Sequence, residues 1–120
     1  MNLEALRPYA LPAAVVAFLV WKFLGFRAVK NRLPELLRQG AVIIDVRSRE
    51  EFAAGNSPGS VNVPLQELAA KTLGVDRDKP IIVCCASGTR SSVAVGILKG
   101  KGYKKVLNAG PWTNTVVAPR

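Results

Sequence analysis

The chain of 120 residues contains no histidine, and this absence excludes several classes of catalytic site. A Ser-His-Asp triad, a Cys-His pair and any metal site with histidine ligands cannot be built from it. Cysteine is scarce as well, because the only two are the neighbours Cys84 and Cys85. Two adjacent thiols are too few for a structural zinc site, and a disulfide between neighbours is strained and rare. We therefore expect free thiols, which suit a reducing compartment, and no metal or cofactor.

Acidic residues are few: 8 Asp and Glu stand against 17 Lys and Arg, which gives a net charge of +9. The basic residues do not form one long run, and they do not alternate with aromatic residues as in proteins that bind single-stranded nucleic acid. No nucleic-acid partner is expected, whereas a basic surface beside an anionic membrane fits the charge. We expect a solvated face to carry four lysines: Lys99, Lys101, Lys104 and Lys105.

Charge is missing altogether from residues 9–21, and the apolar run continues to residue 26 with Lys22 as the one exception. A helix over residues 9–26 would be roughly 27 Å long, just enough for a hydrocarbon core of ~30 Å. Lys22 lies within one turn of the end of this run, where its stem can snorkel to the interface. A cleavable signal peptide fits less well, because only Arg7 precedes the run and bulky residues follow it. A buried helix or an interfacial helix is a further alternative. We predict a single-pass transmembrane anchor in residues 1–26.

The flanks of this segment predict its orientation. Basic residues are concentrated on its C-terminal side, at Lys22, Arg27, Lys30 and Arg32. The positive-inside rule then places residues 27–120 in the cytoplasm, with the chain in the cell membrane. Free thiols agree with this compartment.

Residues 27–120 alternate between strand and helix patterns. Strands are predicted at 41–46, 61–64, 81–84 and 105–108, and helices at 31–40, 49–54, 65–73 and 91–101. This order predicts an α/β domain with a central parallel sheet flanked by helices. Ligands of such sheets bind at the carboxyl ends of the strands, which is where Cys84 and Cys85 stand.

The stretch from Cys84 to Ser91 connects a predicted strand to a predicted helix. Backbone N–H groups and the helix dipole at such a junction hold an anion and lower the pKa of a thiol. Four residues separate Cys85 from Arg90, which suits a loop sized for one sulfur atom. Five residues separate Cys84 from Arg90, which is closer to the phosphate cradle of a phosphatase. The position of Gly88 favours Cys85, and Cys84 continues the apolar strand as a small buried hydrophobe would.

Three blocks of sequence resemble the single-domain rhodanese family, in its membrane-anchored type. They are residues 45–47 with Glu51 and Phe52, residues 55–64, and residues 85–91, in matching order and spacing over roughly residues 27–112. The resemblance implies a rhodanese-like fold and a sulfurtransferase with a small-molecule sulfur donor and a thiol acceptor.

The resemblance also implies roles for individual residues. Cys85 would take sulfur from a donor such as thiosulfate as a persulfide and pass it to a thiol or to cyanide. Arg90 would hold the loop or bind the donor's oxyanion. Six residues of the loop would bind the substrate: Ala86, Ser87, Gly88, Thr89, Arg90 and Ser91. Three upstream residues are expected to be a supporting set of ion pairs: Asp45, Arg47 and Glu51.

Some positions depart from the family pattern. Asn56 and Ser57 stand where a histidine and an isoleucine are usual, and Ala86 replaces a charged or polar residue after the catalytic cysteine. Only eight residues follow Trp112, so the terminal helix of the family is expected to be short or missing. Trp112 itself is expected to cover the core or to make an interfacial contact.

Two other functions remain open at this point. One is a membrane-tethered binding module that docks a cytoplasmic partner and has weak catalysis. The other is a phosphatase or arsenate reductase that uses Cys84. The sequence names no physiological donor, acceptor or protein partner.

Overall fold

A computed structural model describes residues 2–116, and its N-terminal part is one long helix. After the single turn η1 (Leu3–Leu6), helix α1 runs without a break over Arg7–Arg38. The prediction of two separate helices, at 9–26 and 31–40, is therefore wrong. The basic residues between them are good helix formers, and Pro12 and Pro34 are accommodated inside α1. Residue 26, where we placed the domain boundary, lies within this helix.

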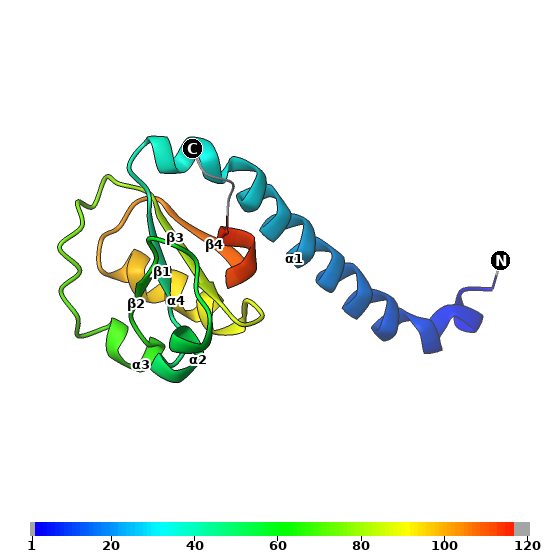
Figure 1. Cartoon of the computed structure of the whole chain (residues 1–120). Helices are drawn as coiled ribbons and strands as arrows, with labels where there is room; N and C mark the ends of the chain where they lie inside the picture. Colours follow the sequence, from blue (N-terminus) through cyan, green and yellow to red (C-terminus); the bar gives the residue numbers. More distant parts are fainter. Residues whose placement is uncertain (1, 117–120) are drawn as a thin grey trace.

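The two halves of α1 have different surroundings. The N-terminal half projects away from the rest of the molecule (Figure 1), and its apolar side chains are exposed. In the C-terminal half, Val29, Leu33 and Leu36 are buried. The segment Leu3–Arg38 is the one helix among residues 2–116 that is long and apolar enough to span a membrane, and none of its most apolar window is buried. The same helix is thus a candidate membrane span and a layer of the core.

The sheet is fully parallel, as predicted, with the strand order β2-β1-β3-β4. Its strands are β1 (Val42–Asp45), β2 (Val61–Asn62), β3 (Ile81–Cys85) and β4 (Val106–Pro111). Strand β2 is shorter than the predicted 61–64, because Pro64 has no N–H for the ladder and caps the next helix. Strand β4 is longer than the predicted 105–108, since it stays paired with β3 as far as Pro111.

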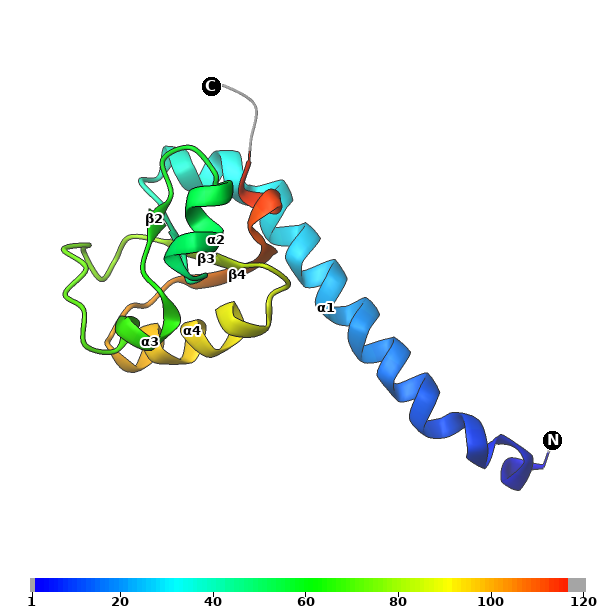
Figure 2. The ribbon, with the colours of Figure 1, turned by 60° about the horizontal axis from the view of Figure 1, so that its bottom comes forward.

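Helices cover both faces of the sheet (Figure 2). The helices are α2 (Arg49–Ala54), α3 (Leu65–Leu68) and α4 (Thr89–Gly100), followed by the short η2 (Trp112–Thr115). Helices α3 and α4 pack on one face, and the C-terminal half of α1 with η2 packs on the other. Helix α3 is shorter than the predicted 65–73, and α4 begins two residues earlier than predicted, which puts Arg90 in its first turn.

Successive residues of β3 point to opposite faces of the sheet. Ile81, Val83 and Cys85 belong to the core beneath α4, whereas Ile82 and Cys84 belong to the core beneath α1. This alternation is the ordinary two-residue period of a strand. The two cysteines are therefore separated by the sheet although they are neighbours in sequence.

One of the four lysines expected on a solvated face is not free in solvent. The ammonium group of Lys101 donates to the backbone oxygens of Leu68 and Lys71 and ties the end of α4 to α3. Lys104 is exposed and pairs with Asp78 at 3.1 Å. The prediction of a shared solvated face is wrong for Lys101, because its long side chain reaches unpaired carbonyls at a neighbouring helix end.

Candidate functional site

The last residue of β3, Cys85, faces a three-residue loop that ends at α4. Gly88 closes the loop with φ +105°, a left-handed conformation that glycine adopts at little cost. The N–H of Gly88 donates to Sγ of Cys85 at 2.9 Å. Both Cys85 and Gly88 are buried, while Ala86, Ser87 and Thr89 are exposed around them. The loop thus encloses the sulfur, while the side chains at its outer edge are exposed to solvent.

A second contact to the sulfur comes from Ser91, which is fully buried in the first turn of α4. Its Oγ lies 3.4 Å from Sγ of Cys85. Burial raises the pKa of the Cys85 thiol, but the Ser91 hydroxyl and the N–H groups of Ser91, Gly88 and Ser87 outweigh it. The net effect lowers the pKa of Cys85 from its ordinary value. The thiolate is the favoured nucleophilic form, and this environment stabilises it.

Asn108 was not among the residues predicted from the sequence, and its side chain joins β4 to the loop and to the first turn of α4 by hydrogen bonds. Its Oδ1 accepts from Oγ of Ser91 at 2.7 Å and from the N–H of Gly110 at 2.8 Å. Because Ser91 has one hydroxyl proton, its O–H must turn from Asn108 to Sγ in order to donate to a Cys85 thiolate. Its Nδ2 donates to Oγ of Ser92 at 2.9 Å and to the carbonyl oxygen of Gly88 at 3.4 Å. A polar residue between the apolar residues of β4 was the available signal, and only the tertiary fold brings it beside Ser91.

Arg90 is held by Glu51 from α2. Two parallel hydrogen bonds join them, Nη1 to Oε1 at 2.7 Å and Nη2 to Oε2 at 2.9 Å. The paired guanidinium and the Ser48 contacts lower the pKa of Glu51 to about 2. Glu51 also closes the capping box of α2 with Ser48. This arrangement joins the first turn of α4 to α2, which corresponds to the loop-holding role that we considered for Arg90.

Asp45 and Arg47 form a buried ion pair, separate from the Glu51 pair. The closest atoms, Nη2 of Arg47 and Oδ2 of Asp45, are 2.8 Å apart. Arg47 also donates to the carbonyl oxygen of Gly55 at 2.7 Å, and its guanidinium lies 4.8 Å from the ring centre of Trp112. Trp112 thus covers this pair, and the group fixes the segment after β1 against the C-terminal part of the fold.

Asn56 and Ser57, which depart from the family pattern, both donate hydrogen bonds to backbone carbonyl oxygens. Ser57 is buried, and its Oγ donates to the carbonyl oxygen of Thr115 at 2.9 Å. Asn56 stays exposed and donates to the carbonyl oxygen of Phe52 at 2.9 Å. The terminal helix of the family was predicted to be short or missing, and the short helix η2 lies at its expected place. The rest of that prediction concerns residues 117–120, which lie outside the described part of the chain.

Cys84 lies on the other face of the sheet from the loop. It is fully buried in the core between the sheet and α1, together with Leu33 of α1 and Ile82 of β3. This burial, together with the charge of Asp45, raises the pKa of Cys84 to about 12. Cys84 therefore does not point into the loop that ends at Arg90. Within residues 2–116, no three cysteine or acidic side chains gather to hold a metal ion.

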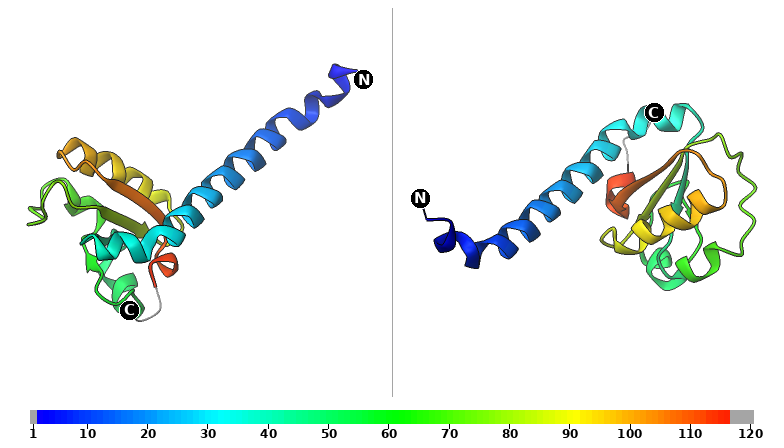
Figure 3. Two further views of the ribbon diagram at one scale, coloured as in Figure 1. Left: turned by 90° about the horizontal axis from the view of Figure 1, so that it is seen from above. Right: turned by 180° about the vertical axis from the view of Figure 1, so that it is seen from behind.

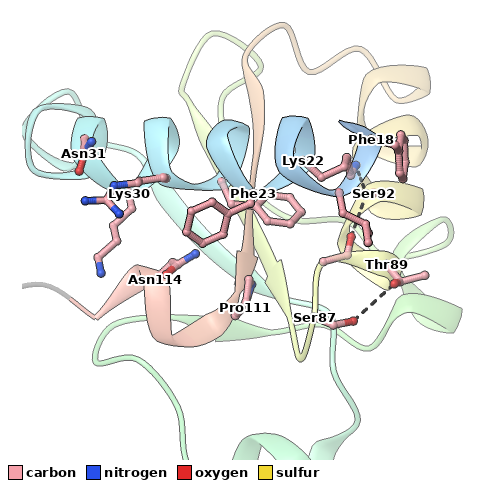
Figure 4. A pocket seen from close by; sticks show the side chains of 14 residues that line it. Phe18, Lys22, Phe23, Lys30, Asn31, Ser87, Thr89, Ser92, Pro111 and Asn114 are labelled. Carbon is pink, nitrogen blue, oxygen red and sulfur yellow. Dashed lines mark hydrogen bonds between the residues drawn. The ribbon is translucent and has the colours of Figure 1, made fainter. Parts of the chain in front are cut away.

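A groove of about 740 Å³ lies between α1 and the loop that encloses Cys85 (Figure 4). Nζ of Lys22 donates to Oγ of Ser92 at 3.1 Å and so joins α1 to α4. Phe26 packs against Gly88 and Gly110, where an added Cβ would lie 2.5 Å from its ring. Phe26, at the end of the apolar run, therefore packs directly on the loop.

Comparisons with known proteins agree with this fold. A model of the rhodanese-like domain matches residues 29–110. Thiosulfate sulfurtransferase GlpE of Pseudomonas savastanoi pv. phaseolicola is 34% identical over 82 residues, which are 68% of this chain and 77% of GlpE. The putative sulfur carrier protein YrkF of Bacillus subtilis is 37% identical over 75 residues, 59% of this chain but 40% of YrkF. The human single-domain sulfurtransferase TSTD1 has a TM-score of 0.62 at 30% identity, over 70% of this chain and 88% of that one.

Proposed function

The chain belongs to the rhodanese-like domain family, and on that premise we propose that it transfers sulfur by carrying it as a persulfide on Cys85. Relatives named as sulfurtransferases support a transferase of the rhodanese type. The observation that carries the proposal is the Cys85 thiol, whose pKa is lowered by Ser91 and the loop N–H groups against the effect of burial. Attack by the thiolate form of Cys85 would need no general base, which suits a chain without histidine.

The proposed reaction has two steps. First, the Cys85 thiolate attacks the outer sulfur of thiosulfate, an S–S bond forms to the enzyme, and sulfite leaves with the electron pair of the broken S–S bond. Second, an acceptor thiolate, or cyanide in an assay, attacks the outer sulfur of the Cys85 persulfide. The enzyme S–S bond breaks and its electron pair returns to Cys85 as thiolate. Atoms and electrons balance in both steps without an external oxidant or reductant.

The residues around Cys85 would have different roles in this reaction. The N–H groups of the loop from Ala86 to Ser91 would stabilise the negative charge of the persulfide, as anion-binding loops do. Arg90 would be a positioning residue, because both of its terminal nitrogens donate a hydrogen bond to Glu51 of α2. Asp45 and Arg47 would support the site as a buried ion pair.

We also propose that α1 anchors the domain to the cell membrane, with residues 27–120 in the cytoplasm. The exposed apolar half of α1 and the basic residues after it support this arrangement. Residues 1–26 would be the anchor and residues 27–120 the sulfur-transfer domain, joined by an unbroken helix.

The test is mass spectrometry of the purified full chain after exposure to thiosulfate. We expect an added mass of about 32 Da, one sulfur atom, on the peptide that contains both cysteines. Cys85→Ser should abolish the adduct, and Cys84→Ser should keep it. Circular dichroism of each variant shows whether the fold is retained.

Two outcomes would contradict the proposal. Loss of the adduct in folded Cys84→Ser alone would move the nucleophile to Cys84. A folded wild-type chain that gains sulfur from no donor would favour a binding module.

A further inference from the structure

The groove between α1 and the Cys85 loop combines aromatic and basic side chains. Its α1 wall carries Phe18, Phe23 and Phe26 together with Lys22, Arg27 and Lys30. Figure 4 shows Phe23 and Lys30 on α1, with Pro111 and Asn114 on the opposite side of the opening. None of the fourteen lining residues is acidic. An apolar wall with three cations and no carboxylate is complementary to a molecule with an apolar chain and an anionic head.

The position of the groove along α1 further restricts which kind of molecule can bind in it. The Lys22–Ser92 hydrogen bond and the packing of Phe26 on Gly88 fix this turn of the helix to the domain. The apolar residues before Lys22, 8–21, rise only about 21 Å, which is less than the ~30 Å hydrocarbon core of a bilayer. A membrane around α1 must therefore reach past Lys22. The groove would then cross the edge of the hydrocarbon core, with Phe18 and Phe23 inside the core and Arg27 and Lys30 at the level of the lipid headgroups.

We propose that an anionic phospholipid occupies this groove, with its headgroup near Arg27 and Lys30 and its acyl chains along Phe18 and Phe23. The inference rests on the membrane anchor of the proposed function. It goes beyond general attraction to an anionic surface, because it assigns the lipid to one groove bordered by Ser87 and Gly88. The lipid would thus contact the segment that encloses Cys85.

The experiment is an NMR titration of the full chain in uncharged detergent micelles. Dioctanoyl phosphatidylglycerol should produce saturable shifts in the amide signals of Ser87, Gly88 and Thr89, and dioctanoyl phosphatidylcholine should bind much more weakly. Each basic side chain near an anionic lipid contributes about fivefold in affinity. The double variant Arg27→Gln/Lys30→Gln should therefore weaken phosphatidylglycerol binding roughly 25-fold. Both side chains are exposed, so the core is not altered.

The matched control is Lys99→Gln/Lys105→Gln, which removes two exposed cations outside the groove and should bind phosphatidylglycerol as the wild type does. Equal binding of the two lipids, or unchanged binding in Arg27→Gln/Lys30→Gln, would overturn the inference. Inorganic phosphate that shifts the same amides with equal affinity would assign the groove to a free anion and also overturn it. The titration contains no sulfur donor and no bilayer, so its failure is distinct from failure of sulfur transfer or of anchoring.

Discussion

At the scale of single residues, the chemistry depends on which face of β3 each cysteine occupies. Cys85 meets an N–H donor at 2.9 Å and the Ser91 hydroxyl, and its pKa is lowered. Cys84 meets apolar side chains, and its pKa is raised to about 12. The pKa values of two neighbouring thiols thus shift in opposite directions, because a strand alternates its side chains between the two faces of the sheet.

Ser91→Ala tests the stabilisation of the Cys85 thiolate. The change removes a hydroxyl that favours the charged form, so the pKa of Cys85 should rise and the thiolate fraction near neutral pH should fall. We expect alkylation of Cys85 by iodoacetamide at pH 7 to slow roughly tenfold, as for a lost hydrogen bond to a charged group. The rate, followed against pH by mass spectrometry, should show its midpoint moved to higher pH. Ser60→Ala is the control, and an unmoved midpoint in Ser91→Ala would contradict the assignment.

Gly88→Ala tests the close packing of the loop under α1. An alanine at φ +105° is strained by about 1–2 kcal/mol, and its Cβ would lie 2.5 Å from the ring of Phe26. We expect a lower thermal midpoint and slower alkylation of Cys85. Gly96→Ala is the matched control, because Gly96 lies in α4 with open space around it, and it should stabilise the chain by about 0.5–1 kcal/mol. Equal effects of the two substitutions would refute this account.

At the scale of elements, α1 is the part that the sequence described least well. Local patterns distinguished an apolar segment from a later amphipathic one, but they contained no signal that the two are continuous. The register of Val29, Leu33 and Leu36 against the sheet carries the helix through its basic stretch. Strand β3 and the junction to α4 were predicted within two residues, because an apolar run followed by a glycine loop is a strong local pattern.

Leu33→Ala compared with Leu24→Ala tests the division of α1. Leu33 is fully buried, whereas Leu24 is 56% exposed. We expect Leu33→Ala to lower the free energy of unfolding by about 2–5 kcal/mol and Leu24→Ala to leave it nearly unchanged. Urea unfolding of the full chain in uncharged detergent, followed by circular dichroism, measures both. Similar losses in the two variants would mean that the N-terminal half of α1 also packs on the domain.

At the scale of the whole molecule, one continuous helix links a candidate membrane span to the candidate site around Cys85. The molecule extends 57 Å along its longest axis, because the N-terminal half of α1 stands clear of the sheet and its helices (Figure 3). Phe26 and Lys22 dock the same helix on the loop and on α4. The distance of the active loop from a membrane would therefore be fixed by the fold rather than by a flexible linker.

Membrane fractionation tests the anchor. The full chain should stay in the membrane pellet after an alkaline carbonate wash. Val16→Glu/Val20→Glu should release it, since a charged residue at the centre of a spanning helix costs roughly 3 kcal/mol. Both valines are exposed, so the domain should keep its fold, and Val16→Ala/Val20→Ala should remain in the pellet. Release of the wild type by carbonate, or cleavage of the domain by protease added outside intact cells, would contradict the anchor or its orientation.

The sequence alone determined the α/β class, the parallel sheet, the free thiols and the preference for Cys85, because these follow from periodicity, composition and the spacing of the loop. Tertiary structure alone decided that Arg90 pairs with Glu51, that Asn108 bonds Ser91, and that Lys22 and Phe26 dock α1 on α4 and on the loop. Each of these contacts joins residues at least 17 positions apart in the chain. Local patterns contain no information on such pairs, since strand order and helix packing bring them together.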